Sequence, residues 1–287
     1  MKILITGKNS YIGTHVRDFL IEYGHAVDEL DTLTEEWKTY DYSSFDAIVH
    51  VAAIVHENAK KSSEEIFKAV NTELPYNIAQ LAKIAGVKQF VFMSTMAVYG
   101  CEKKLPKGNV IDENTPLNPK TLYGKSKLEA EKLLMELQDE SFHVAIIRPP
   151  NVYGKDCPGN YMNAFKKIAL KIPVFPDAFR ESRQSMLYID NLSNFIRLVI
   201  ENYLFGIFFP QDDVIPNSCE LIKLLGDSIG KKIVFSGFLG KIMVLFKNIT
   251  LIVKLYGGVS YNNNLSYHFN NDYRLFSFND GINRTFR

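Results

Sequence analysis

The sequence predicts a doubly wound α/β fold, in which helices cover both faces of one parallel sheet. Short apolar runs alternate with stretches of helical length over the first 150 residues. The runs are apolar at nearly every position, as is typical of strands buried on both faces. Strands that alternate with helices are parallel, because each helix carries the chain back to the same edge of the sheet.

The expected elements follow one another in close succession. Lys2–Thr6 is the first predicted strand, Tyr11–Glu22 the first helix, and a second strand ends near Leu30. The later predicted strands are Asp46–Ala52, Gln89–Ser94 and His143–Arg148, and the later helices are Ile66–Ala85, Thr121–Leu137 and Asn191–Asn202. Gly86 caps the second helix, and Pro149-Pro150 ends the fifth strand.

The alternation loosens after Asn151, where glycine and proline interrupt the chain more often. We therefore expect residues 1–150 to form the domain that holds the sheet. Residues 151–287 are expected to form mostly a smaller, loop-rich subdomain that binds substrate, with residues 184–202 returning to the core of the first domain.

Composition excludes several classes of protein. Lys+Arg number 33 against 32 Asp+Glu, so no basic surface for nucleic acid is expected. Three widely spaced cysteines, Cys101, Cys157 and Cys219, predict neither a disulfide framework nor a metal site. Only Ile3–Ile5 is apolar at the start, which is too short for a signal peptide, and we expect a cytoplasmic protein.

The most apolar tract is Ile233–Tyr256, but lysines interrupt it and no transmembrane segment is expected. As a single helix it would carry Lys241, Lys247 and Lys254 on one half and large apolar residues on the other. We expect the apolar stripe, which includes Leu245, Phe246 and Ile249, to pack on a core. Contact with a membrane surface or a partner protein is the alternative.

Gly7, Ser10 and Gly13 stand at the three positions of a G-x-x-G-x-x-G spacing between the first strand and the first helix. A tight turn there directs backbone N–H groups and the positive end of the helix dipole at a pyrophosphate. Ser10 replaces the middle glycine and would either crowd the phosphate or donate its hydroxyl to it. An ordinary strand-to-helix turn is the alternative. The spacing favours a dinucleotide-binding domain at residues 1–150.

Asp31 follows the second strand about 20 residues after this loop. An acidic group there accepts hydrogen bonds from ribose hydroxyls and repels a 2′-phosphate, which favours NAD. NADP remains an alternative, because Lys8 beside Gly7 could attract a phosphate.

Tyr123 and Lys127 lie four residues apart at the start of a predicted helix, so both project from one face. A free phenol titrates near pH 10, and we expect the ammonium and a cationic nicotinamide ring to lower the pKa of Tyr123 by about three units. Ser94 and Thr95 end the fourth strand, where α/β sheets bind ligands.

With these residues, the sequence resembles the extended short-chain dehydrogenase/reductases, specifically the NAD-dependent epimerase/dehydratase group that acts on nucleotide sugars. The matching segments occur in the family's order: TGKNSYIG (6–13), DAIVHVAA (46–53), VN (70–71), STMAVYG (94–100), YGKSK (123–127), RPPNVYG (148–154) and RQSMLYIDN (183–191).

The resemblance implies a Rossmann fold, bound NAD, a UDP-linked sugar substrate and a homodimer formed through the helix that carries Tyr123. It implies that Tyr123 is the general base, that Lys127 tunes it and holds the nicotinamide ribose, and that Thr95 hydrogen-bonds the reacting hydroxyl. The implied cofactor pocket comprises Gly7, Ser10, Tyr11, Ile12, Gly13, Asp31, Ala52, Ala53, Asn71, Lys127 and Pro149. The implied substrate contacts are Ser94, Asn151 and Arg183, the last two at the diphosphate.

Met96-Ala97 stand where dehydratases of this family carry Asp-Glu, so dehydration is not expected. The favoured reaction is 4-epimerisation of a UDP-hexose, and NAD(P)H-dependent reduction of a UDP-4-keto-hexosamine is the alternative. A dinucleotide sensor without activity is the alternative from another class, but a sensor needs no tuned phenol. Among the other residues, His50 is expected in the core, and His56 and Glu57 in a solvated loop or, alternatively, at the substrate.

Overall fold

The computed structural model describes residues 1–55 and 63–286 and divides into two compact units. The first unit comprises residues 1–100, 116–149 and 192–210. The second comprises residues 101–115, 150–191 and 211–287. Each unit therefore combines segments that are far apart in the sequence, and residues 101–115 belong to the second unit although they precede Asn151.

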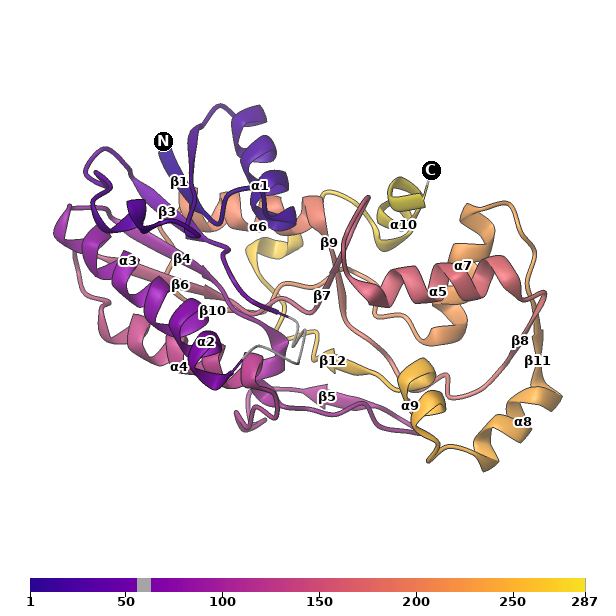
Figure 1. Ribbon diagram of the computed structural model, residues 1–287. Coiled ribbons are helices and arrows are strands. Elements are labelled where there is room, and N and C mark those ends of the chain that lie inside the picture. The colour runs from indigo at the N-terminus through magenta and orange to yellow at the C-terminus, as the bar shows by residue number, and fades with distance from the viewer. Residues whose placement is uncertain (56–62, 287) are drawn as a thin grey trace. The chain divides into compact units, whose positions relative to one another are not determined.

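A parallel six-stranded sheet forms the centre of the first unit (Figure 1). Its strands are β1 (Lys2–Thr6), β2 (Ala26–Leu30), β3 (Ala47–His50), β4 (Gln89–Met93), β6 (His143–Ile147) and β10 (Gly206–Phe208). They lie in the order β10-β6-β4-β3-β1-β2, so the chain starts inside the sheet and winds outward to both edges. This confirms the predicted doubly wound fold, and β10 adds an edge strand that the sequence analysis did not predict.

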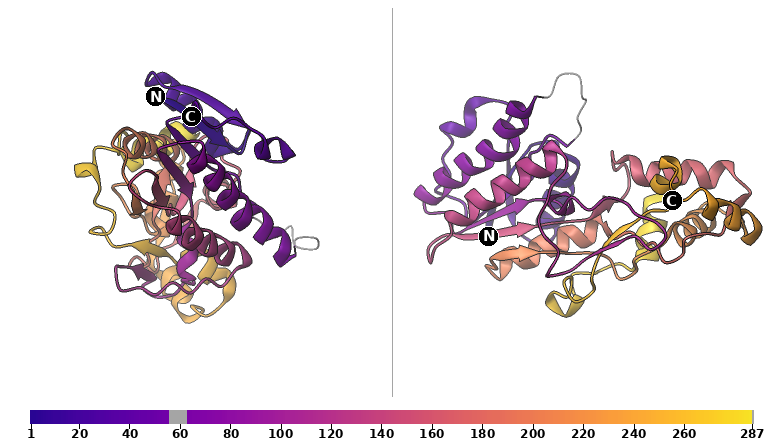
Figure 2. Two further views of the ribbon diagram at one scale, coloured as in Figure 1. Left: turned by 90° about the vertical axis from the view of Figure 1, so that its left-hand side faces the viewer. Right: turned by 90° about the horizontal axis from the view of Figure 1, so that it is seen from below.

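Helices cover both faces of this sheet. They are α1 (Tyr11–Glu22), α2 (Glu64–Lys68), α3 (Leu74–Ile84), α4 (Leu122–Glu136) and α6 (Ile189–Glu201), with short 3₁₀ turns η1 (Glu35–Lys38) and η3 (Met96–Tyr99). A π-helical turn, η2 (Ala69–Glu73), joins α2 to α3 within the helix predicted at 66–85. Figure 1 and the right-hand view of Figure 2 show α2, α3 and α4 side by side on one face, whereas α1 and α6 lie on the other.

The core beneath α3 and α4 is apolar. Ile48, Phe90 and Val144 from three neighbouring strands pack with Ile78 of α3 and Leu134 of α4, and all five side chains are fully buried. Burial of such side chains contributes about 1.5–3 kcal/mol each. This packing holds α4 against the sheet.

One ion pair is buried in this unit beside the apolar core. Arg148, which follows β6, donates from Nε to Oε1 of Glu131 on α4 (3.0 Å) and from Nη2 to Oε2 (2.6 Å). Its Nη1 donates to the hydroxyl of Tyr99 (3.0 Å), and Ser94 donates its hydroxyl to Glu131. A buried pair is tolerated when its hydrogen bonds are made in this way, because they offset the loss of water.

The second unit is built from short elements. Its strands are β5 (Asn109–Ile111), β7 (Asn151–Tyr153), β8 (Val174–Pro176), β9 (Met186–Tyr188), β11 (Val234–Ser236) and β12 (Val259–Tyr261). Its helices are α5 (Asn160–Lys171), α7 (Ser218–Ser228), α8 (Gly237–Leu245), α9 (Thr250–Tyr256) and α10 (Phe278–Phe286), with the 3₁₀ turn η4 (Phe269–Asn271). The strands form three parallel pairs, β5–β12, β7–β9 and β8–β11.

Residues 233–256 do not form the single helix that the sequence predicts. The turn at residues 246–249 separates α8 from α9. Leu245 is 79% exposed, and Phe246 and Ile249 are also exposed, so the expectation that this stripe packs on a core is wrong for these residues. Within α8, Gly240 faces inward, because a Cβ there would lie 1.9 Å from the backbone O of Asp177, and Leu245 lies on the opposite side of the helix.

A buried carboxylate organises the second unit. Asp212 accepts hydrogen bonds from the hydroxyl of Tyr153 (2.8 Å), the amide of Asn191 (2.9 Å) and the backbone N of Tyr188 (3.1 Å). These bonds connect β7, β9 and the start of α6. Burial nevertheless raises the pKa of Asp212 to about 6, because its charged form has lost water.

This shift predicts an unusual pH dependence of stability. Between pH 7 and pH 5, Asp212 binds a proton in the folded state but not in the unfolded state. Acidification over this range should therefore increase its contribution to the free energy of unfolding by about 1 kcal/mol. Urea unfolding at both pH values measures the effect, and Asp212→Asn should remove it. An identical pH dependence in the two proteins would contradict the assignment.

The Glu131–Arg148 pair predicts a large loss of stability when one partner is removed. Glu131→Ala leaves the Arg148 charge buried and uncompensated, which typically costs about 3–5 kcal/mol. Glu136→Ala, on the exposed side of the same helix, is the matched control and should change stability by about 0.5 kcal/mol or less. Thermal or urea denaturation compares the two, and equal effects would show that the pair is not needed.

Candidate active site

The turn after β1 brings together the ends of three strands. Gly7 has φ of +110°, and a Cβ on it would lie 2.7 Å from the backbone N of Ala52, which follows β3. Only glycine tolerates both conditions. The N–H groups of Gly7 and Lys8 donate to the carbonyl of Leu30 at the end of β2 (3.1 and 3.4 Å). The structure thus places Gly7 against Ala52, as expected for two residues of one pocket.

Ser10 is the N-cap of α1. Its Oγ accepts a hydrogen bond from the backbone N of Gly13 (3.1 Å), and its own proton remains to be donated. Tyr11 and Ile12 begin the first turn, where backbone N–H groups have no partner within the helix. A tight glycine turn that leads into a helix N-terminus fits a dinucleotide pyrophosphate.

Asp31 immediately follows β2 and is the neighbour of Leu30, which accepts from Gly7. Its Oδ1 accepts from the backbone N of Leu33 (2.8 Å), which fixes the carboxylate beside the glycine turn. This position suits an acceptor for ribose hydroxyls.

Thr95 and Tyr123 are brought together by β4 and α4. Thr95 follows β4, and its Oγ1 accepts from the backbone N of Ala97 (3.1 Å) at the start of η3. Tyr123 lies in the first turn of α4, which Thr121 caps by accepting from Gly124 N (3.0 Å). The Thr95 side chain and the Tyr123 phenol lie close enough for Thr95 to lower the pKa of the phenol.

Lys127 lies one turn further along α4 and is fully enclosed. Its Nζ donates to the carbonyl of Met93, the last residue of β4 (2.8 Å), and lies 4.3 Å from the centre of the Phe92 ring. Burial lowers the pKa of Lys127 to about 7, and the charge of Glu131 opposes this shift.

The groups that the chain itself supplies do not lower the pKa of Tyr123, and the expected lowering also involves a bound nicotinamide ring. Burial raises the pKa of Tyr123 to about 12, and the Thr95 side chain offsets only part of that increase. The phenolate is the charged form, so loss of water disfavours it, and Lys127 is itself partly neutral near pH 7. Tyr123 is therefore a neutral phenol at neutral pH.

Asn71 is buried, and its amide is fully used by the protein. Its Oδ1 accepts from Ile54 N (2.9 Å), and its Nδ2 donates to Ile54 O (3.0 Å) and to Ser126 Oγ (3.1 Å). Thr72 donates to the carbonyl of Ser126 (2.8 Å). These bonds connect the segment after β3, which includes Ala53, to the turn of α4 that carries Tyr123. The sequence analysis missed Thr72 and Ser126, although one lies next to Asn71 and the other inside YGKSK.

Ser94 and Pro149 hydrogen-bond the elements that hold the site. Ser94 is buried, and its hydroxyl points to Glu131, so the structure directs it into the core. The carbonyl of Pro149 accepts from Met96 N (3.0 Å), which joins the chain after β6 to η3.

His50 is a core histidine, as predicted. It is fully buried between the rings of Phe90 and Phe92, and its Nδ1 hydrogen-bonds the hydroxyl of Thr6 (2.7 Å). Burial lowers its pKa to about 3, so the ring is neutral. His56 and Glu57 lie outside the described residues.

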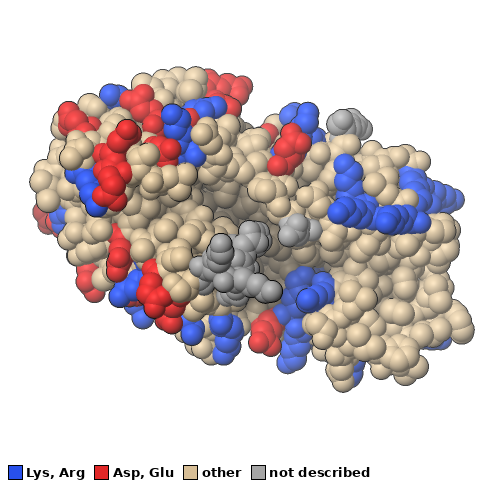
Figure 3. All heavy atoms as spheres, viewed as in Figure 1, with Lys and Arg blue, Asp and Glu red and all other residues tan. Residues whose placement is uncertain are grey.

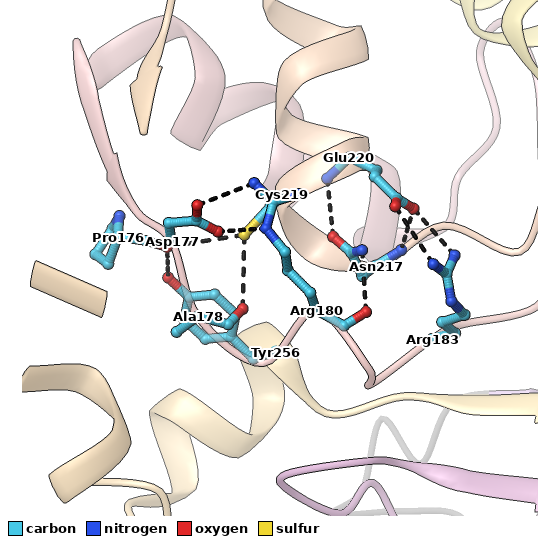
Figure 4. A network of polar contacts seen from close by, with 9 residues as sticks. All are labelled: Pro176, Asp177, Ala178, Arg180, Arg183, Asn217, Cys219, Glu220 and Tyr256. Atoms are coloured by element: carbon cyan, nitrogen blue, oxygen red, sulfur yellow. Dashed lines mark hydrogen bonds and ion pairs between the residues drawn. The ribbon is translucent and has the colours of Figure 1, made fainter. Parts of the chain in front are cut away.

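The predicted diphosphate contacts belong to the second unit. Asn151 begins β7 and is exposed. Arg183 donates from Nη1 to the carbonyl of Ile215 (2.7 Å) and to Oε2 of Glu220 (3.1 Å), so its guanidinium is held in one orientation (Figure 4). An anion at Arg183 would compete with Glu220, a contact that the sequence did not reveal.

Arg180 is a second cation on the same segment. It donates from Nε and Nη2 to the two carboxylate oxygens of Asp177 (2.6 and 3.0 Å), as Figure 4 shows. The sequence analysis missed it, although its spacing of three residues from Arg183 in RESR was a visible signal.

Comparison with known proteins agrees with this geometry. The family model described as "NAD dependent epimerase/dehydratase family" matches residues 3–203. A UDP-glucose 4-epimerase from Vibrio cholerae is 29% identical over 257 residues, which cover 80% of this chain and 76% of the relative. An N-acetyl-alpha-D-glucosaminyl-diphospho-ditrans,octacis-undecaprenol 4-epimerase from Escherichia coli O157:H7 is 28% identical over 250 residues, covering 80% and 73%.

Solved structures share the fold at low identity. A UDP-glucuronic acid 4-epimerase from Bacillus cereus, in complex with NAD, aligns with a TM-score of 0.72 at 18% identity and covers 100% of this chain and 95% of its own. A dTDP-4-dehydrorhamnose reductase from Bacillus anthracis, in complex with NADP, aligns with a TM-score of 0.68 at 18% identity over 99% and 98%. Because the family model spans most of the chain, from the glycine turn through α4 to α6, this protein belongs to the NAD-dependent epimerase/dehydratase family.

Proposed function

We propose that this protein transfers a hydride to and from C4 of a nucleotide-linked hexose, as a 4-epimerase does. The observation that carries the proposal is the closeness of the Thr95 side chain to the Tyr123 phenol, with Lys127 one helical turn away on α4. A hydroxyl, a phenol and a lysine in this arrangement can position a sugar hydroxyl and exchange its proton. Relatives named as 4-epimerases of UDP-glucose and of a lipid-linked amino sugar support the same reaction type.

The first unit fits a dinucleotide, and we assign NAD to it. The glycine turn packs closely against Ala52 and leads into the N-terminus of α1, and Asp31 stands where it would accept from a ribose. The helix N-terminus at the pyrophosphate would be formed by Ser10, Tyr11, Ile12 and Gly13. The rest of the cofactor pocket would be lined by Ala52, Ala53, Asn71, Lys127 and Pro149. The bound dinucleotide supplies a hydride acceptor and a cationic ring.

Residues of the chain itself would transfer the proton of the C4 hydroxyl. Thr95 would orient the C4 hydroxyl, and Tyr123 would take its proton when the sugar is oxidised and return it when the ketone is reduced. Lys127 Nζ donates to Met93 O, and this bond holds α4, and with it the phenol, at the end of β4. Positive charge beside the phenol would offset the burial that raises its pKa.

A 4-ketoreductase is the second candidate, because it would use Thr95, Tyr123 and Lys127 for the reducing half of the same reaction. In that half-reaction the Tyr123 phenol would donate its proton to the ketone oxygen. Conversion of UDP-glucose or UDP-N-acetylglucosamine without added coenzyme would favour the epimerase. A requirement for added NADH or NADPH and a keto sugar would favour the reductase.

We assign substrate binding to the second unit, through Asn151 and Arg183 at a diphosphate. Arginine suits this role because it makes two charge-assisted bonds to phosphate oxygens. The diphosphate is common to UDP-sugars and to a polyprenyl-linked sugar, so Arg183 would serve either carrier. A homodimer formed through α4 remains part of the proposal.

Tyr123→Phe tests the catalytic assignment. Loss of the Tyr123 hydroxyl should lower kcat by a factor of ~10² or more, because the proton of the C4 hydroxyl then has no acceptor. Bound NAD should be retained. Turnover of UDP-glucose and the NAD content of the purified protein are the two measurements. Tyr76→Phe is the matched control, since Tyr76 lies on α3 and hydrogen-bonds only Gln80 among the described residues. An undiminished rate in Tyr123→Phe would refute the role of the phenol.

Asp31→Asn tests the choice of cofactor. Removal of the carboxylate charge should weaken NAD binding by about tenfold, since charge-assisted hydrogen bonds contribute about 1.5–3 kcal/mol, and should reduce discrimination against NADP. Titration calorimetry with both dinucleotides measures this. Asp28→Asn, three residues earlier on the exposed side of β2, is the control and should leave both affinities unchanged. Equal affinities in Asp31→Asn and the unaltered protein would exclude the predicted ribose contact.

A further inference from the structure

The chain contains a long tract that is basic and has no acidic residue. No Asp or Glu occurs between Asp227 and Asp272, whereas five lysines do. Three of them, Lys241, Lys247 and Lys254, lie on or between α8 and α9 and are exposed. Among the described residues, none of the three forms an ion pair with a carboxylate. This part of the second unit therefore carries uncompensated positive charge.

Large apolar side chains are also exposed on these two helices and in the turn between them. Phe238 is 75% exposed, Leu245 79% and Leu251 73%, and Val244, Phe246 and Ile249 are exposed as well. Along α8, Phe238, Lys241 and Leu245 follow one another at helical spacing and project to the same side. Leu251 and Lys254 do so along α9. We call these exposed residues between Phe238 and Lys254 the α8–α9 surface.

The α8–α9 surface is held firmly from its buried side. Gly240 brings α8 against the backbone of Asp177, and Tyr256 at the end of α9 donates its hydroxyl to Pro176 O (2.8 Å). The Tyr256 ring packs on Phe175 and Phe179. Ser218 of α7 donates to the carbonyl of Leu255 (2.6 Å). The outward position of the apolar residues is thus imposed by the packing of the unit.

We propose that the α8–α9 surface docks on an anionic lipid bilayer. Apolar side chains with lysines among them match a membrane interface, where the apolar groups enter the acyl boundary and the lysines meet lipid phosphates. In Figure 3 the region over α8 and α9 is tan with blue at its margin and shows no red. In the part of the chain that the structure describes, no helix has the length and apolarity of a membrane span, so docking here is peripheral.

The charge favours a bilayer over a second copy of the chain. In a symmetric dimer formed through this surface, Lys241, Lys247 and Lys254 would face the same lysines across the interface with no carboxylate from this tract to pair with them. Buried like charges oppose association, whereas anionic lipids neutralise them. The inference concerns binding alone and does not depend on the proposed reaction.

Co-sedimentation of the full chain with lipid vesicles tests the proposal. The protein should bind vesicles of phosphatidylcholine with 30 mol% phosphatidylglycerol about tenfold or more tightly than vesicles of phosphatidylcholine alone, and less tightly as salt is raised. Phe238→Ser, Leu245→Ser and Leu251→Ser combined should lower binding about tenfold or more. Lys241→Glu, Lys247→Glu and Lys254→Glu combined should abolish the preference for the anionic lipid.

Matched controls use exposed residues of the first unit. Leu33→Ser with Ile84→Ser removes two side chains that are 95% and 84% exposed, and Lys88→Glu with Lys132→Glu reverses two exposed lysines. Both controls should bind as the unaltered protein does.

Circular dichroism of every variant checks the fold, and chromatography reports association of copies. Absence of binding to both vesicle types, or equal loss in variants and controls, would overturn the proposal. A dimer that the serine variant dissolves would assign the surface to a second copy instead.

Discussion

The hydrogen bond from Lys127 Nζ to the carbonyl of Met93 is the interaction on which the site depends. It ties the first turns of α4 to the last residue of β4, so that Tyr123 on the helix lies beside Thr95 just beyond the strand. Both groups are buried, and an amine that loses this partner would keep a desolvated donor. The bond therefore positions the phenol and resists displacement of α4.

Charged residues extend this support beneath the site. Glu131 lies one turn beyond Lys127 on α4, accepts from Ser94 at the end of β4, and pairs with Arg148 after β6. A helix with these residues on its inner side is only weakly amphipathic, because its buried face is partly polar. Apolar residues would pack there at lower cost, but they could not hold the ends of β4 and β6 at specific hydrogen-bonding distances.

In the second unit, close backbone packing decides which side chains reach solvent. The contact at Gly240 turns α8 so that Phe238 and Leu245 face outward. Glu220, by contrast, both caps α7 and holds the guanidinium of Arg183. The second unit thus orients the Arg183 guanidinium through Glu220 and leaves the apolar, basic α8–α9 surface exposed.

Several features of the site follow from local sequence. The glycine at position 7, the acidic residue directly after β2, and the four-residue spacing of Tyr123 and Lys127 each depend on residues close together in the chain. Strand and helix periodicity are local as well, so the boundaries of β1 and α1 agree with the expectation residue for residue. The edge strand β10 was not predicted, because its three residues are too few to show the alternating pattern of a strand.

Other features depend on which distant residues meet. The amide of Asn71 is used by Ile54 and Ser126, and the guanidinium of Arg183 by Glu220, partners that lie 17 to 55 residues away. The raised pKa of Tyr123 in the chain by itself likewise follows from burial, which outweighs the opposing effect of Thr95. The sequence by itself determined the order of the elements and the chemistry at the strand ends, since both arise from local periodicity and residue type. Only the tertiary structure decided hydrogen-bond partners, protonation and the exposure of α8 and α9, because these depend on packing between segments distant in the chain.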